Sequence, residues 1–304
     1  MATPIVRQST ARDGAKAHRR LPGRRLLVIA AFAALIGAPA GPAAAASPDF
    51  RLSGHVERIS DPSAVANARM IPEAQRLIDI ESPTYYAVKG DVIGKGVRFS
   101  FDLEATAGVP VAAIEIAHDP TGRQQILAVG RPTPDSLAKL EQMQGSGQAS
   151  SKTIAREARP EGASTLAIWR ETHGFFSTFW TDPIGLTVNS VIDEARWQYN
   201  GVNVRSLTGQ DLRQWMTANG WREVSHSIGA YYNAGKTVGT VYTNDHFETR
   251  SWFPCPHAVD HDTWYQANNV YGFKDGHTGG GVNTWATGVC KGLLSVTAFA
   301  SPGA

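Results

Sequence analysis

Four ionisable side chains stand close together near the C-terminal end of this 304-residue chain: His257, Asp260, His261 and Asp262. Imidazole and carboxylate groups at this density can bind zinc or another divalent ion. They can also form an acid–base pair in which a carboxylate orients a histidine that titrates near neutral pH. His257 and His261 are the candidate metal ligands, but the glutamate of the HExxH motif is absent, so no metal or other cofactor is assigned. The third interpretation, which the flanking residues favour, is a polar loop that leads into a strand.

Aromatic and amide side chains follow these groups in the sequence. The set comprises Trp264, Tyr265, Trp285, Asn268 and Asn269. Flat rings stack on the apolar faces of sugars while amides hydrogen-bond hydroxyl groups, so this mixture suits glycan binding. The alternative is ordinary core packing, because the alternation along residues 264–267 is typical of a strand with one buried face. Not every ring of the segment can face inwards, and we expect at least one to be exposed.

The only two cysteines, Cys255 and Cys290, bracket this segment. In an oxidising compartment a lone pair of cysteines in one region favours a disulfide, and C-x-x-C spacing is absent. Closing a loop of this size stabilises the fold by roughly 3–4 kcal/mol in the chain-entropy model. We therefore expect a disulfide between Cys255 and Cys290.

Three acidic residues lie near the aromatic cluster of residues 180–197: Asp182, Asp193 and Glu194. A pair of carboxylates at a suitable separation can hydrolyse a glycosidic bond, but the sequence does not supply that separation. The sequence favours a solvated strand edge for all three.

The run Gly279-Gly280-Gly281 follows several polar residues. A phosphate-binding loop needs a following helix that carries Lys and then Ser or Thr, and this run precedes a strand pattern instead. We expect a flexible hairpin turn here and no nucleotide.

Residues 1–46 have the pattern of an export signal peptide. Basic residues precede the apolar run 26–36, and Ala44-Ala45-Ala46 forms an A-x-A-like cleavage site. The apolar run is about 11 residues, shorter than the roughly 20 that a spanning helix needs, and no later segment is apolar enough to cross a bilayer. Arg24-Arg25 also has the spacing of a twin-arginine signal, so the export route stays open. We expect a bacterial protein that is secreted, or located in the periplasm or cell envelope.

The overall composition is that of a globular protein, with 42% hydrophobic and 18% charged residues and a formal net charge of +2. Many of the arginines belong to the leader, and no basic stripe follows it. Nucleic acid is therefore not an expected partner, since binding by counterion release needs a concentrated basic face.

The chain after the leader changes character along its length. Residues 47–144 mix helical and strand patterns, including a short helix over residues 134–143. Residues 145–165 are small, polar and interrupted by Pro160, which is typical of a linker. Residues 166–304 consist of short strand patterns separated by Gly and Asn turns. The expected fold is α+β overall, with a smaller mixed N-terminal region and a mainly antiparallel C-terminal domain, a β-sandwich or a barrel-like fold.

Two local patterns stand out within residues 166–304. Asn200-Gly201 is a strong hairpin signal. Residues 208–219 form the one predicted helix of this region, with Thr208 as its cap, an apolar side at Leu212 and Trp215, and Gly220 at its end.

Several short motifs resemble a family of uncharacterised exported bacterial β-rich proteins. The motifs are WTDPIGLTVNSV, WQYNG, a later GW, NNVYGFKDG, NTWATGVC and LLSV, and the resemblance covers residues 179–299. It implies secretion and a β-rich domain with a late disulfide. It implies no catalytic residues.

These observations support two hypotheses of function. The first is a secreted or envelope-associated protein whose β-rich domain binds an extracellular glycan or envelope polymer through the aromatic and amide residues. The second is a secreted hydrolase, with or without a metal ion, centred on His257, Asp260 and His261. The sequence alone does not decide whether the protein is an enzyme.

Overall fold

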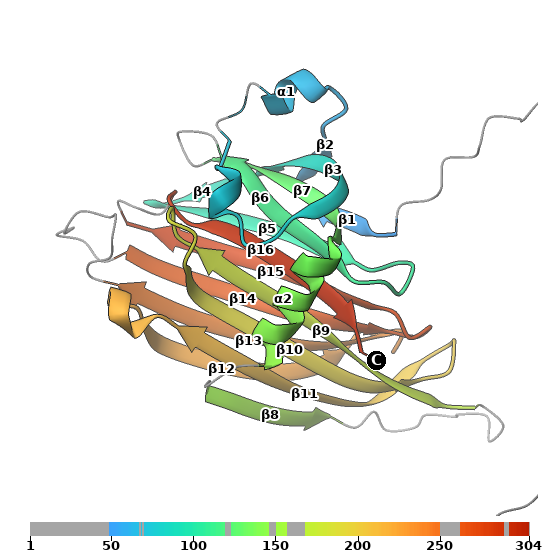
Figure 1. The fold of residues 1–304 in the computed structure, drawn as a ribbon. Helices are drawn as coiled ribbons and strands as arrows, with labels where there is room; N and C mark the ends of the chain where they lie inside the picture. Colours follow the sequence, from blue (N-terminus) through green and yellow to red (C-terminus); the bar gives the residue numbers. More distant parts are fainter. Residues whose placement is uncertain are drawn as a thin grey trace, which may run out of the picture. The chain divides into compact units, whose positions relative to one another are not determined.

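Along much of the chain, side chains alternate between the two faces of a strand. The chain folds into two antiparallel sheets (Figure 1). The computed structural model describes residues 49–66, 68, 70–118, 123–145, 150–156, 168–249, 262–288 and 292–303. Within these residues the fold is mostly β and sandwich-like, without a closed barrel. The predicted β-sandwich is confirmed at this level, whereas the expected α+β class is wrong, because the described residues contain only two short α-helices.

The seven-stranded sheet has the order β1 (Arg51–Gly54), β5 (Gly96–Glu104), β15 (Thr278–Thr287), β14 (Asp262–Phe273), β13 (Val238–Thr249) and β12 (Arg222–Tyr232), with β4 (Asp91–Ile93) paired to β5. The nine-stranded sheet has the order β2 (Val56–Arg58), β3 (Ile80–Lys89), β7 (Gln124–Pro132), β6 (Val111–His118), β16 (Ser295–Pro302), β9 (Arg170–Thr181), β10 (Thr187–Tyr199), β11 (Val204–Trp215) and β8 (Ser150–Arg156).

Strands from both sides of the predicted linker share each sheet. β5 pairs with β15, and β6 pairs with β16. The predicted linker itself contains β8, which pairs with β11. Ser47–Ala304 accordingly form one compact unit.

Helical structure is sparse in the described residues. The α-helices are α1 (Pro62–Ala66) and α2 (Pro134–Gly145), and the 3₁₀ turns are η1 (Glu73–Gln75) and η2 (Thr217–Asn219). The predicted helix over residues 134–143 is confirmed as α2. None of the described helices has the length and apolar character needed to cross a bilayer.

Two layers of apolar packing hold the sandwich together. Between the sheets, Phe101 and Val270 of the seven-stranded sheet meet Phe176 and Trp197 of the nine-stranded sheet. A second core lies on the far face of the nine-stranded sheet, where Leu140 of α2 belongs to the same cluster as residues of β9 and β10. Figure 1 shows α2 lying across these strands. β9 and β10 are therefore buried on both faces.

The last strands of the two sheets, β8 and β12, are joined by side-chain hydrogen bonds. Arg156 Nη1 donates to the carbonyl oxygen of Ala230 over 2.8 Å. The hydroxyl of Tyr232 donates to the carbonyl oxygen of Arg156 over 2.8 Å and accepts the N–H of Leu207 at 2.9 Å. One long side of the sandwich is thereby closed.

The predicted helix over residues 208–219 is wrong. Residues up to Trp215 belong to β11, and only Thr217–Asn219 form a single 3₁₀ turn. The inward residues of β11 include Asp211 and Arg213, which are buried. Because charged residues occupy the buried positions, apolar alternation is absent, and the spacing of Leu212 and Trp215 imitates a helical face.

The glycine run is also not a turn. Gly279, Gly280 and Gly281 belong to the central strand β15, and the hairpin turn precedes them. A Cβ atom on Gly280 would overlap the ring of Phe176 from the opposite sheet. A Cβ atom on Gly281 would meet the side chains of Asp102 and Tyr271. These glycines leave room for neighbouring rings, which explains glycine in a central strand.

The close contact at Gly280 gives a test of this packing. Gly280→Ala should destabilise the protein by about 1–3 kcal/mol, because the new methyl group displaces Phe176 in a filled core. Gly292→Ala is the matched control, since no atom lies within 4 Å of a Cβ built there. Urea denaturation of both variants measures the effect, and equal stability of the two would contradict the packing.

A buried carboxylate adds a pH-dependent element to the core. Glu115 of β6 is buried and accepts a hydrogen bond from Gln125 Nε2 at 3.0 Å. It lines a small cavity of about 30 Å³ together with Trp180 and Trp264. Burial raises the pKa of Glu115 well above its ordinary value, and a backbone hydrogen bond from Val296 opposes this only in part.

The raised pKa of Glu115 predicts that the protein loses stability as the pH rises. A group whose pKa is higher in the folded state stabilises the fold fully below its unfolded pKa, about 4.3 for Glu. That stability is lost as the pH rises through the folded-state pKa. Glu115→Gln should flatten this dependence and raise the unfolding temperature at pH 7 by about 2–4 °C for each kcal/mol recovered. The new amide has an acceptor in Gln125 Oε1, which lacks a partner among the described residues. Thermal unfolding of both proteins between pH 4 and 8 measures the effect. An equal dependence of unfolding temperature on pH in the variant and the unaltered protein would refute the role of Glu115.

Candidate functional site

The residues singled out in the sequence fall into three groups. His257, Asp260, His261 and both cysteines lie outside the described residues, so their predicted roles and the disulfide stay predictions. Asp262 and Tyr265 belong to β14. The remaining four side chains divide between the two faces of the seven-stranded sheet: Trp264 and Asn268 are buried, whereas Asn269 and Trp285 are half-buried on the outer face.

Trp264 and Asn268 connect the two sheets. The ring of Trp264 packs edge-on against Trp180 of β9, with 4.9 Å between centroids. Asn268 Nδ2 donates to Thr178 Oγ1 of the same strand over 2.9 Å. Between them, Gln266 Oε1 accepts the indole N–H of Trp180 at 2.7 Å. These contacts give Trp264 and Asn268 a structural role inside the sandwich.

The outer face of the seven-stranded sheet carries ordered rows of polar and aromatic residues. The strand register places Ser225, His246, Tyr265, Trp285 and Arg98 in one row across five strands. The next row consists of Ser227, Asn244, Ala267, Asn283 and Ser100. Because Ala267 is the smallest side chain among larger neighbours, the surface is hollowed above it.

An open pocket of about 180 Å³ lies at this position. Its lining combines an indole, three amide residues, a guanidinium and an imidazole. The lining residues are Arg98, Ser225, Asn244, Asp245, His246, Gln266, Ala267, Asn283 and Trp285. Gly96 of the neighbouring strand allows the indole of Trp285 to lie across β5, since a Cβ atom there would overlap the indole. The pocket thus combines a ring surface with hydrogen-bonding groups.

The charge state of His246 suits hydrogen bonding. Burial lowers the pKa of His246, and the negative charge of Glu248 offsets this only in part. The imidazole is therefore neutral at pH 7, with one donor and one acceptor nitrogen. The permanent cation of the pocket is Arg98.

More rings lie further along the same face. Tyr271 donates its hydroxyl proton to Asp102 Oδ1 over 2.8 Å, reaching across Gly281. Phe273 stacks on His277 with 4.0 Å between ring centroids. Burial and the nearby carboxylate of Asp102 raise the pKa of Tyr271, so the phenol stays protonated. These rings extend the aromatic character of the face beyond the pocket.

A second group of polar residues lies between the sheets, and sequence reasoning missed most of it. We call Asp193, Asp211, Arg213, Glu223, His226 and Asp245 the interlayer cluster. They come from β10, β11, β12 and β13. Asp193 and Asp211 face each other across the β10–β11 pair. One pattern in the sequence could have predicted these buried charges. Leu207, Gly209, Asp211 and Arg213 alternate with the period of a strand, and the face that begins with Leu207 also carries the two charged residues.

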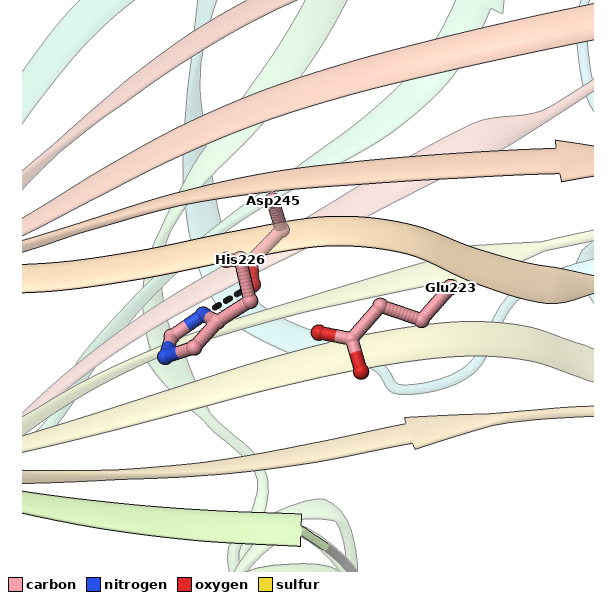
Figure 2. A group of neighbouring side chains, drawn as sticks. All are labelled: Glu223, His226 and Asp245. Atoms are coloured by element: carbon pink, nitrogen blue, oxygen red, sulfur yellow. Dashed lines mark hydrogen bonds and ion pairs between the residues drawn. The ribbon is translucent and has the colours of Figure 1, made fainter.

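Ion pairs and hydrogen bonds link these side chains. Arg213 Nε lies 2.6 Å from Asp211 Oδ2, and the same guanidinium contacts Glu223. His226 Nδ1 lies 2.8 Å from Asp245 Oδ1, and its Nε2 lies 3.5 Å from Asp211 Oδ2. Figure 2 shows His226 and Asp245 joined by this hydrogen bond, with Glu223 beside them.

Two carboxylates of the interlayer cluster are held in an unfavourable environment. Burial raises the pKa of Asp193 well above its ordinary value, and the charges of Asp245 and Asp211 add to this effect. Burial also raises the pKa of Asp245, while its hydrogen bond to His226 opposes the shift. Thr243 Oγ1 donates to Asp193 Oδ2 over 3.1 Å.

The predicted solvated strand edge for Asp182, Asp193 and Glu194 is wrong, because all three are buried. Asp182 Oδ1 accepts the backbone N–H groups of Ile184 and Leu186 at 3.0 and 2.9 Å, which fixes a turn. Glu194 instead pairs with Arg196 at 2.6 Å. The three carboxylates therefore serve separate structures, and they do not form the opposed pair of a glycosidase.

The interlayer cluster predicts a large difference between two arginines. Arg213 is 4% exposed, and Arg213→Met should cost about 3–5 kcal/mol, because Asp211 and Glu223 lose the guanidinium that pairs with both of them. Arg222 is 61% exposed and pairs with Glu248, so Arg222→Met should cost at most about 1 kcal/mol. Urea denaturation compares the two, and similar losses would show that Arg213 does not neutralise the cluster.

Comparisons with protein-family models, curated proteins and solved structures found no match for this chain. The resemblance to exported β-rich proteins therefore stays a prediction. A sandwich architecture supports many unrelated functions, so it does not assign one. The function is accordingly inferred from the chemistry of the outer pocket and of the interlayer cluster.

Proposed function

We propose that this protein binds an extracellular glycan or cell-envelope polymer through the outer face of its seven-stranded sheet. The observation that supports this proposal is the pocket above Ala267, where Trp285 lies beside Asn244 and Asn283. An indole offers a flat apolar surface to the C–H face of a sugar ring. The two amides offer donors and acceptors to hydroxyl groups on either side.

The size of the pocket favours recognition of a short part of a long ligand. Its volume of about 180 Å³ is below the roughly 300–1,000 Å³ of pockets that enclose a whole small molecule. A polymer instead lies along an open face and places one unit in the hollow. Tyr271 and Phe273, further along the same face, are positioned to contact neighbouring units.

The hydrolase hypothesis gains no support from the described residues. His257, Asp260 and His261 lie outside them. His226 forms a pair with Asp245, but its second nitrogen faces Asp211 in the interior and not the outer pocket. Binding without catalysis is the function that the outer pocket supports best.

A retention experiment tests the proposal. The exported chain is mixed with insoluble cellulose, chitin, xylan, starch and peptidoglycan, and bound protein is measured after washing. We expect retention on at least one of these polymers. Trp285→Ala should weaken that binding about tenfold, on the scale of about 1–3 kcal/mol for loss of one stacking ring.

Trp169→Ala is the matched control for this experiment. Trp169 precedes β9 of the other sheet, and its ring stacks under the guanidinium of Arg205 at 4.0 Å. This variant should bind as the unchanged protein does. Absence of retention on every polymer, or equal weakening by both substitutions, would overturn the proposal.

A further inference from the structure

The interlayer cluster concentrates carboxylates in the interior of the sandwich. Among the described side chains, those of Asp193, Asp211, Glu223 and Asp245 lie with the guanidinium of Arg213 and the imidazole of His226. Carboxylates packed together in a dry interior are costly to ionise. A divalent cation is a ligand that offsets this cost.

Two carboxylate oxygens of the cluster also lack a partner. Asp193 Oδ1 and Asp245 Oδ2 have no hydrogen bond among the described residues. Both residues are buried, with 0% and 2% of their whole-residue surface exposed. Asp193 lies beside the other carboxylates of the cluster, because the negative charges of Asp245 and Asp211 interact with it. Its other oxygen, Oδ2, accepts a hydrogen bond from Thr243. A buried oxygen that accepts nothing is a free ligand position.

We propose that Glu223, His226 and Asp245 bind a divalent transition-metal ion, Zn²⁺ or Mn²⁺, between the two sheets. One ligand atom of each residue lies within 4.8 Å of the other two (Figure 2). One imidazole with carboxylates is a donor set that suits zinc and manganese better than the all-oxygen sets of calcium. Asp193 of the opposite sheet adds a third carboxylate near Asp245.

The neighbours of these three residues orient them for this role. Asp211 lies 3.5 Å from His226 Nε2, which leaves Nδ1 directed at Asp245. The guanidinium of Arg213 forms an ion pair with the carboxylate of Glu223 and fixes its position. Such outer contacts fix the ring and the carboxylate of metal ligands. On binding, the ion takes the place of the proton between His226 Nδ1 and Asp245 Oδ1, and that proton is released to solvent.

Access to the site is available from the edge of the sandwich. The side chains of Glu223 and His226 are 16% and 11% exposed, whereas that of Asp245 is fully buried. Both belong to β12, the last strand of its sheet, and precede Ala230 and Tyr232, where β12 is bonded to β8. An ion can therefore reach the site without unfolding of the core.

Isothermal titration calorimetry of the EDTA-treated full chain with Zn²⁺ and with Mn²⁺ tests the proposal. We expect one bound ion per chain and a rise in unfolding temperature at saturation, because only the folded state contains the site. Glu223→Gln and His226→Gln should each weaken binding by about tenfold or more. Glu248→Gln, which removes a carboxylate from the outer face of β13, is the matched control and should leave the affinity unchanged.

Two further measurements keep the proposal falsifiable if a variant fails to fold. In the unaltered protein, bound Mn²⁺ should broaden the NMR signals of residues 223–226 and 243–245 first. In His257→Gln and His261→Gln, zinc affinity should be retained. Binding that disappears in these two variants, broadening elsewhere, or no binding of either ion would overturn the assignment.

Discussion

Strand β14 sets the register on which both faces of the seven-stranded sheet depend. Trp264, Gln266 and Asn268 point between the sheets, so Ala267 and Asn269 must point outwards. The inward side chains bond to Trp180 and Thr178 of the opposite sheet, which fixes the position of β14 along its axis. A slip by one residue would exchange the two faces, and the hollow above Ala267 would disappear. The core and the outer pocket are therefore consequences of one alignment.

Polar groups inside the sandwich add directional contacts to an otherwise apolar core. Hydrogen bonds between Gln266, Asn268 and Thr178 have fixed geometry, unlike the packing of Val270 or Phe101. The ion pairs of Arg213 with Asp211 and Glu223 add further directional contacts, nearer the β8–β12 side of the sandwich. In a low-dielectric interior, such groups are costly when a partner is lost. This sandwich therefore tolerates few relative positions of its two sheets.

Sequence patterns identified the parts of the fold in which buried positions are apolar. They predicted α2 from a helical pattern that begins at Pro134, and the β-rich sandwich from its short strands. For Trp264 the sequence left ligand binding and core packing as alternatives, and the structure buries its side chain. They failed at β11, where Asp211 and Arg213 are buried, and at Gly280, where a distant ring fills the space. Both failures arise from side-chain contacts between different strands, which a local pattern does not contain. The outer pocket likewise exists only through strand pairing.

The bonds that join β8 to β12 have a consequence for how the molecule behaves among its own copies. A bare edge strand offers unpaired backbone groups to any other extended chain. Here the carbonyl oxygen of Ala230 is already bonded to Arg156, and Tyr232 extends across to the same residue. A second chain that approached this side would have to displace both contacts before it could add a strand. The sandwich thus resists edge-to-edge aggregation along β8 and β12, which are longer than the edge strands β1 and β2 at the other ends of the two sheets.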